Sequence, residues 1–260
     1  MMKKFTAMIV ICGCLVFAAS AAVADEPLQA QLFPDRIGIG TFYNGEAISM
    51  NGSMPADCDV VVRVTGADMH LKMKKKGKVL GLLWLNRDTV NFDAVPEAFL
   101  LYTAGKFDSL LGDLQKQSPV WKLGLTALED RIVVTPVTSE RSTLIQDLLK
   151  LKEKEGFYAV NAEGIRYTPV SAEQKKFDAV LRIPPKLPPG NYRVEAYAVR
   201  KGDIVATWQH PLAVKLDSFP KVLSSLAFDH SALYGILATL VAVVAGLFTG
   251  VFFGGGKGAH

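Results

Sequence analysis

Cysteine is scarce in this chain, which has three cysteines among 260 residues. Cys12 and Cys14 lie in an apolar N-terminal segment, so Cys58 is the one cysteine of the remaining chain. A single cysteine excludes an internal disulfide. Because Cys58 precedes the apolar stretch 59–64, we expect a small buried side chain, with a redox or intermolecular role as the alternative.

The linear signatures of catalysis and metal binding are also missing. None of the four histidines (His70, His210, His230, His260) lies three or four residues from another ligand, and there is no Cys-x-x-Cys pair. Residues 107–110 lack the glycine of a hydrolase GDSL block, and no Gly-x-Ser-x-Gly elbow occurs. We therefore expect a non-enzymatic protein without catalytic residues, metal or cofactor. A metal site assembled in three dimensions stays open.

An excess of charge of one sign is likewise absent. The formal net charge is +4, from 29 basic and 25 acidic residues. Such a mixed surface gives no indication of a nucleic-acid partner. The stretch between the two apolar ends, roughly 200 residues, is long enough to bury one large core or two small ones.

An uninterrupted apolar run does occur near the C-terminus, over residues 232–253. These 22 residues carry no charge and as a helix would extend ~33 Å. That length matches a hydrocarbon core of about 30 Å, so the run predicts a transmembrane helix. The protein is therefore expected to be a domain tethered to a membrane.

The N-terminus has the pattern of a secretory signal peptide. Lys3 and Lys4 precede the short apolar stretch 7–18, and small residues follow at 22–24. Lipidation at Cys14 is the weaker alternative. Lys257 in the tail agrees with the positive-inside rule. These features predict a single-pass protein of a bacterial inner membrane, with its body in the periplasm and its C-terminus in the cytoplasm.

The body between the two ends has the period-two alternation and frequent turn signals of a mainly β protein, an Ig-like β-sandwich with a helical insertion. Asn44-Gly45 predicts a two-residue hairpin. A second hairpin is expected around residues 75–77, and an amphipathic helix over 142–154 that Thr138 or Ser139 caps and Gly156 ends. Alternation leaves open whether the β parts form one sandwich or two.

These patterns divide the chain into seven segments. We predict a signal peptide (1–24), an N-terminal β domain (25–105), a helical segment (106–156), a C-terminal β-sandwich part (157–217), a linker (218–231), a transmembrane helix (232–253) and a cytoplasmic tail (254–260).

Five segments in order carry a resemblance to a known family: residues 42–52, 59–66, 81–86 with Val95-Pro96, 187–198, and 232–235 at the start of the final helix. Together they resemble the transmembrane protein family Alph_Pro_TM, named from alphaproteobacteria, over nearly the whole mature chain. Residues 81–86 (GLLWLN) depart from the family pattern by one extra leucine. The resemblance implies an exported β-rich protein with one C-terminal span and no established activity. It also implies an accessory role, because family members are often encoded near sulfite-exporter-type permeases.

Two features are candidate contact surfaces. Lysines cluster in the segment 71–78, namely Lys72, Lys74, Lys75, Lys76 and Lys78. They are either a solvated hairpin tip or a contact for an anion, anionic lipid or acidic partner. In the anchor, small residues recur every four positions, namely Ala238, Ala242, Gly246 and Gly250. Such a ridge lets another helix approach closely, so we expect a helix–helix contact there.

We predict a membrane-anchored periplasmic accessory or binding protein that contacts a multispan permease or a second copy through its anchor. The alternative is an envelope structural or assembly factor that handles other exported proteins.

Overall fold

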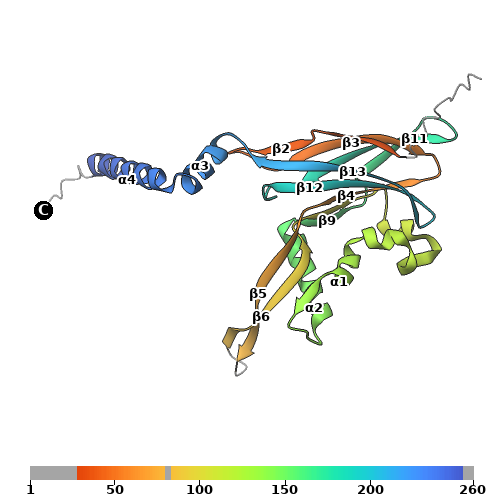
Figure 1. Cartoon of the computed structure of the whole chain (residues 1–260), viewed down its shortest axis with the longest axis horizontal. Helices are drawn as coiled ribbons and strands as arrows, with labels where there is room; N and C mark the ends of the chain where they lie inside the picture. Colours follow the sequence, from red (N-terminus) through yellow and green to blue (C-terminus); the bar gives the residue numbers. More distant parts are fainter. Residues whose placement is uncertain (1–27, 80–82, 254–260) are drawn as a thin grey trace, which may run out of the picture.

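A computed structural model of the chain describes residues 28–79 and 83–253, with residues 76–79, 83–88, 218–220 and 251–253 described by their backbone alone. The predicted signal peptide (1–24) and tail (254–260) lie outside the described residues. Figure 1 shows a β-sandwich, a hairpin and a helical region on one side of it, and two helices that leave one end of the sandwich toward the C-terminus.

The outer layer of the sandwich is a four-stranded antiparallel sheet. Its strand order is β1 (Gln29–Phe33), β3 (Glu46–Pro55), β11 (Gln174–Ile183), β10 (Ile165–Pro169). Strand β3 alternates: Ile48, Met50 and Met54 point into the core, whereas Asn51 is exposed. The period of two in the sequence therefore gives this sheet one apolar and one polar face.

The central layer is a six-stranded sheet that is apolar on both faces. Its strand order is β2 (Arg36–Ile39), β13 (Asp203–Leu216), β12 (Gly190–Arg200), β4 (Asp59–Thr65), β7 (Phe99–Tyr102), β9 (Tyr158–Asn161). Val60, Val62 and Val64 of β4 belong to the core shared with the four-stranded sheet, and Val61 to a second core. Burial on both faces explains the continuous valine run in this strand.

The second core lies under a layer of helices and a long hairpin. Its elements are β5 (Asp68–Val79), β6 (Leu83–Pro96), β8 (Val133–Thr135), the 3₁₀ segments η1 (Phe107–Gln117), η2 (Pro119–Leu123) and η3 (Leu125–Ala127), and the helices α1 (Leu128–Arg131) and α2 (Arg141–Glu155). Phe92, Leu123 and Ile145 are buried there against the central sheet. The insertion is thus a third layer.

The N-terminal and C-terminal β parts form one sandwich. Strand β3 pairs with β11 over ten residues, and β4 pairs with β12 over seven. Each sheet thus combines strands from both parts of the chain, and a single core fills the space between the sheets. This settles the question that sequence alternation left open, and a mainly β fold with a helical insertion and an apolar C-terminal helix is confirmed.

The two predicted hairpin turns were wrong. Strand β2 pairs with β13, and β3 pairs with β1 and β11, so the loop at Asn44-Gly45 crosses between sheets instead of closing a hairpin. Gly45 has a positive φ of 85°, and a Cβ there would lie 2.7 Å from the Ile183 carbonyl oxygen, so both the backbone and the space favour glycine. Strand β5 continues through residues 75–77, because a bulge between Lys75 and Lys76 lets the ladder run on to Val79.

The helical segment differs from the expectation in its first half. Residues 107–127 are mostly 3₁₀, and Gly112 and Gln115 interrupt the first segment with positive φ. Helix α2 ends at Gly156 with φ 84°, as predicted. Its N-cap is Glu140 with no side-chain capping bond, so the predicted cap by Thr138 or Ser139 was wrong. The Thr138 hydroxyl accepts a bond only from the Glu140 N–H.

The segment predicted as a linker contains a helix. Strand β13 leads directly into α3 (Ser218–Phe228), which precedes α4 (Ser231–Phe253). Over Ser231–Gly250, α4 has a mean hydropathy of 2.2, and none of this stretch is buried. Among the described helices, α4 alone is long and apolar enough to cross a membrane.

Candidate functional site

The side chains that most often carry chemistry are dispersed in this fold. No group of three His, Cys, Asp or Glu side chains within residues 28–79 and 83–253 is placed to hold a metal ion. His70 pairs with Asp93 on the exposed hairpin. His210 stacks on Trp208 with ring centroids 5.7 Å apart, and its Nδ1 lies 2.8 Å from the Pro211 carbonyl oxygen.

Cys58 is fully buried in the sandwich core, as predicted. Its thiol donates to the Asp57 carboxylate across 3.6 Å. Burial, more than any nearby charge, raises the pKa of the thiol above its ordinary value. A thiol that stays protonated is a poor nucleophile, so Cys58 acts here as a core side chain.

The lysines of the hairpin divide between its two faces. Lys72 and Lys74 are exposed on β5, and Lys75 pairs with Glu140 at the start of α2. The side chains of Lys76 and Lys78 lie outside the described part of the chain. The lysines follow an extended strand and do not crowd a turn, because β5 continues past them to Val79.

An apolar groove separates this hairpin from α2, and we call it the hairpin groove. It has a volume of about 460 Å³. It is lined by Met73, Val90, Phe92, Leu144, Leu148 and Leu151, with Lys74, Lys75 and Asp147 at its rim. An apolar floor with charged groups at its edge suits an amphipathic segment or an acyl chain.

A second hollow lies where the central sheet emerges from under the helical layer, and we call it the arginine cleft. Its volume is about 820 Å³. Arg63 crosses the cleft floor: its Nε and Nη2 donate to the Glu195 carboxylate at 3.0 and 2.8 Å, and Nη2 also donates to the Tyr197 hydroxyl at 2.7 Å. Arg193 lies 3.9 Å from the same carboxylate, and Arg131 also lines the cleft.

The arginine cleft has an excess of basic side chains. Arg63, Arg131 and Arg193 line it with two carboxylates, those of Asp68 and Glu195. The guanidinium of Arg63 is also 5.3 Å from the centre of the Tyr197 ring, and its side chain is 17% exposed. Arg63 is paired with Glu195 and Arg131 with Asp68, so the cleft has one arginine in excess of its two carboxylates.

Sequence reasoning missed this cleft. Arg63 interrupts the apolar run 60–64, and Glu195 interrupts the apolar stretch 194–199. Each of these two apolar stretches contains one charged residue, and the two charges are of opposite sign. Because buried charges are normally paired, this pattern could have predicted an ion pair between the two strands.

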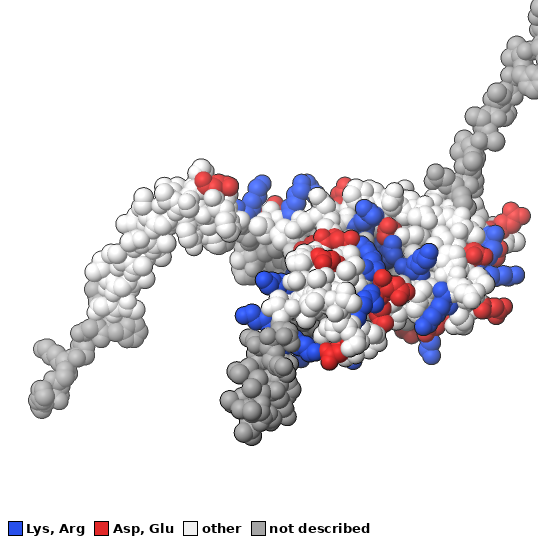
Figure 2. All heavy atoms as spheres, turned by 60° about the horizontal axis from the view of Figure 1, so that its bottom comes forward, with Lys and Arg blue, Asp and Glu red and all other residues white. Residues whose placement is uncertain are grey.

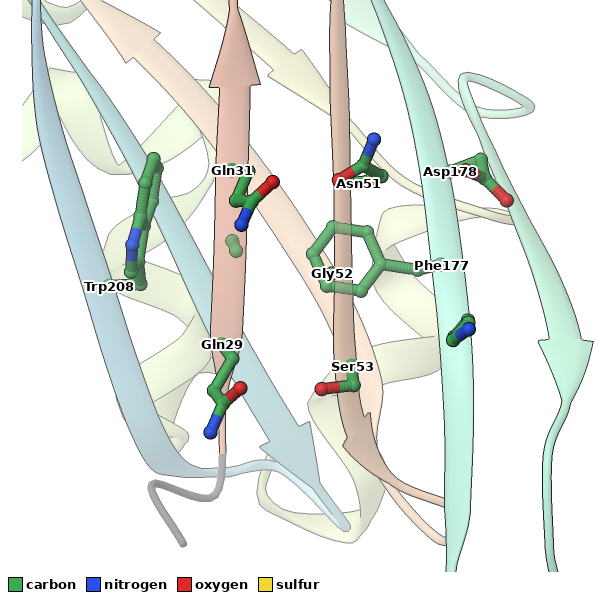
Figure 3. Close-up of a pocket in the computed structure, with 10 residues that line it drawn as sticks. Gln29, Gln31, Asn51, Gly52, Ser53, Phe177, Asp178 and Trp208 are labelled. Atoms are coloured by element: carbon green, nitrogen blue, oxygen red, sulfur yellow. The ribbon is translucent and has the colours of Figure 1, made fainter.

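The third hollow, of about 720 Å³, lies on the polar face of the four-stranded sheet, and we call it the amide groove (Figure 3). Cross-strand pairing sets Gln29 opposite Ser53 and Gln31 opposite Asn51. Figure 3 shows these side chains beside the edge strand β1, with Trp208 on the far side of that edge.

Gly52 of β3 lines the amide groove through its backbone, because its side-chain position faces the core like those of Met50 and Met54. A Cβ at Gly52 would be 2.2 Å from the Gln29 carbonyl oxygen and 2.6 Å from the ring of Phe177. Phe177 is fully buried beneath it. Amide and hydroxyl groups, together with the exposed Lys176 and Asp178, offer donors and acceptors to a polar ligand.

The predicted ridge of the anchor is open along its length. Ala238 and Ala242 are exposed, and no atom lies within 4 Å of a Cβ built on Gly246 or Gly250. The Thr249 hydroxyl donates to the Ala245 carbonyl within the helix, so it leaves the ridge surface apolar. The ridge is therefore available to a neighbouring helix.

The comparison with known proteins identifies a family. A family model described as "Putative transmembrane protein (Alph_Pro_TM)" matches residues 27–254. The chain belongs to this family. The match extends over the sandwich, the helical layer, α3 and α4 of this Alph_Pro_TM protein. No curated protein and no solved structure matches the chain.

Proposed function

We propose that this Alph_Pro_TM protein is a non-enzymatic, membrane-anchored accessory protein of the periplasm. Its body binds a small ligand or a partner protein, and its anchor docks on a multispan permease of the sulfite-exporter type or on a second copy. The observation that carries the proposal is α4, a helix without charge whose apolar side chains are exposed on every face and which is attached to a folded body.

Helix α4 supports membrane anchoring through its composition and exposure. Leu233, Ile236, Val241 and Leu247 are each more than half exposed. Figure 2 shows basic and acidic groups interspersed over the body, whereas α4 carries none. An apolar surface of this extent is stable in lipid and would aggregate in water.

The proposed orientation depends on the two ends of the chain. A cleaved signal peptide at 1–24 would export the body, and Lys257 would hold the tail in the cytoplasm. The arginine cleft supports the binding role, because one arginine is in excess of its two ion pairs, Arg63–Glu195 and Arg131–Asp68. Small sulfur-containing anions, the substrates of the proposed permease partner, have the charge for this cleft.

The docking surface of the anchor is the ridge of small residues. Between helices in lipid, close packing takes the place of the hydrophobic effect, so glycines at the contact increase the dispersion energy. The test is purification of the full-length protein in mild detergent with identification of the proteins that accompany it. We expect one permease in fixed ratio, or a second copy of the chain.

Two double variants make this experiment specific. Gly246→Leu with Gly250→Leu would block the ridge, whereas Val244→Leu with Phe248→Leu changes as many positions about 200° away around the helix. The first pair should lose the partner in co-purification and in a membrane two-hybrid assay, and the second should keep it. Retention of the partner by both would reject docking through the ridge.

The hairpin groove favours the alternative function, an envelope assembly factor. Its apolar lining and charged rim would accept an amphipathic segment of an exported client. In that case diverse envelope proteins, and no permease in fixed ratio, would accompany the purified protein. Leu151→Glu in the groove lining, where the side chain is 36% exposed, would then release these clients. Leu114→Glu outside the groove, where the side chain is 41% exposed, would not.

A lipid contact of the lysines is a separate part of the proposal. Figure 1 shows the β5–β6 hairpin on the side of the body nearer to α3, and Lys72 and Lys74 are exposed on β5. Each lysine near an anionic surface contributes about 1 kcal/mol. Changing Lys74, Lys75 and Lys76 to glutamine should weaken salt-sensitive binding of the body to anionic liposomes. Unchanged binding would refute the contact.

A further inference from the structure

Helix α3 leaves apolar side chains uncovered. The exposed fractions are 64% for Val222, 41% for Leu223 and 84% for Phe228. No described residue of α3 belongs to either core of the body. A helix of a globular protein normally buries its apolar stripe, so this one needs another partner.

The residues of α3 are divided between two sides. At 100° per residue, Val222, Leu223, Leu226 and Ala227 follow one side of the helix. Lys221, Ser224, Ser225 and the last residue, Phe228, follow the other. The helix contains no acidic residue. A short amphipathic helix with a serine- and lysine-bearing polar side is typical of a segment that lies in a lipid headgroup layer.

The connection to α4 places α3 at that layer. Helix α4 has 23 residues, so its length of ~34 Å slightly exceeds a hydrocarbon core of about 30 Å and its ends reach the headgroups. Tyr234 in its first turn is an aromatic residue of the type found at that level. Phe228 is only three residues before Ser231, so it lies within about 11 Å of the end of the span.

The body has an exposed aromatic residue beside the start of α3. The N–H of Asp217, the residue before α3, donates to the Ile39 carbonyl at 2.9 Å, which holds the end of β2 against this joint. Phe42 lies three residues beyond Ile39 and is 95% exposed. The loop tip and the helix therefore present apolar side chains at the same end of the sandwich.

We propose that α3 lies along the phospholipid headgroup layer, with its apolar side toward the acyl chains, and that Phe42 makes a second contact with the same layer. The two contacts hold the sandwich in one orientation above the membrane. This inference rests on the anchoring of α4 that the proposed function includes. It adds a lipid-binding role for residues 218–228 and for the β2–β3 loop.

The test is a set of single cysteines labelled with an environment-sensitive fluorophore, in the full chain with its own three cysteines replaced by serine. The labelled positions are Leu223 and Phe42 as proposed contacts, Lys221 on the opposite side of α3, Leu240 in the span, and Val205 on the body. The protein is reconstituted into phosphatidylcholine–phosphatidylglycerol vesicles that carry a quencher either near the headgroups or deep in the acyl chains.

We expect the headgroup quencher to reduce emission at Leu223 and Phe42 well beyond its effect at Lys221, and Val205 to be unaffected. Leu240 should respond to the deep quencher. If Leu223 behaves like Val205 while Leu240 is quenched, the anchor is inserted and the proposed role of α3 is wrong. Shielding of Leu223 from water without lipid quenching would mean a protein contact and would also overturn it. Loss of quenching at Leu240 would instead refute the anchoring itself.

Discussion

The Arg63–Glu195 ion pair is the most buried charged contact described in the body, and its removal should measurably destabilise the fold. Two nitrogens of Arg63 reach one oxygen of Glu195, and Tyr197 accepts a further bond. The side chains are 17% and 10% exposed. Glu195→Gln retains the shape and one acceptor oxygen but leaves the guanidinium without its counter-charge.

The magnitude follows from this intermediate burial. Breaking a fully buried ion pair costs about 3–5 kcal/mol, and breaking a surface pair costs about 0–1 kcal/mol. For Glu195→Gln we expect a loss of about 2 kcal/mol in the free energy of unfolding, and a similar loss for Arg63→Met. Because the second change removes the charge that the first leaves unpaired, the double variant should lose about 2–3 kcal/mol in total, which is a coupling of about 1–2 kcal/mol.

The assay is urea unfolding of the full chain in mild detergent, followed by tryptophan fluorescence, with the slope compared between variants. The matched control is the Arg200–Asp57 pair, whose geometry is close at 2.7 Å but whose side chains are 43% and 63% exposed. Disrupting the Arg200–Asp57 pair should lower the free energy of unfolding by less than disrupting Arg63–Glu195, and added salt should weaken the exposed pair more. A coupling below ~0.3 kcal/mol for Arg63 and Glu195 would refute the reasoning, and Arg63 would then contribute only its packing on Tyr197.

Two further changes test the packing. Gly52→Ala should destabilise the protein by about 2–3 kcal/mol, because the new methyl group would displace β1 or the buried ring of Phe177. The control Gly40→Ala meets no atom within 4 Å and should be neutral. Equal urea midpoints for the two variants would contradict this prediction. Lys152 is buried beside Phe157, and burial lowers its pKa below the ordinary 10.5. Between the lowered pKa of Lys152 in the folded protein and its pKa of 10.5 in the unfolded chain, the unfolded chain binds more protons. The free energy of unfolding should therefore rise with pH up to about 10.5. Lys152→Met should raise stability by about 1 kcal/mol at pH 7 and remove this alkaline rise, and an unchanged pH profile would contradict the cause.

Local sequence patterns predicted the elements whose structure depends on their own residues. The run 232–253 is a helix because an apolar segment of this length satisfies its backbone hydrogen bonds within itself as a helix. Gly156 ends α2 because a left-handed residue is needed there. These features need no knowledge of distant parts of the chain.

Features set by distant residues were not predictable in the same way. The Asn44-Gly45 dipeptide is typical of a hairpin turn, but β2 forms its backbone hydrogen bonds with the edge of β13 and not with β3. Pro211 lies within β13 and is accommodated because β2 joins that edge only from Ala213 onward. Strand partners depend on the whole core, and neighbouring residues do not contain that information.

The same distinction applies to the candidate sites. The lysine run and the anchor ridge are patterns within one segment, so the sequence showed them. The arginine cleft joins Arg63 of β4 to Glu195 of β12, which lie 132 residues apart and meet only through the β4–β12 ladder. A sequence search for motifs at fixed spacing cannot find such a pair.

The path of the chain from β13 through α3 into α4 determines which of these surfaces can act together. Strand β13 is part of the central sheet, and the third layer packs on that sheet, so the position of α3 also fixes where the hairpin lies relative to the membrane. A flexible linker after residue 217 would separate anchor and body, whereas here the bond from Asp217 to Ile39 leads directly into α3. Inserting a flexible glycine–serine segment between Asp217 and Ser218 should therefore preserve anchoring and ligand binding, but abolish any partner contact that needs anchor and body at once. Partner co-purification that survives this insertion would show that the anchor alone makes the contact.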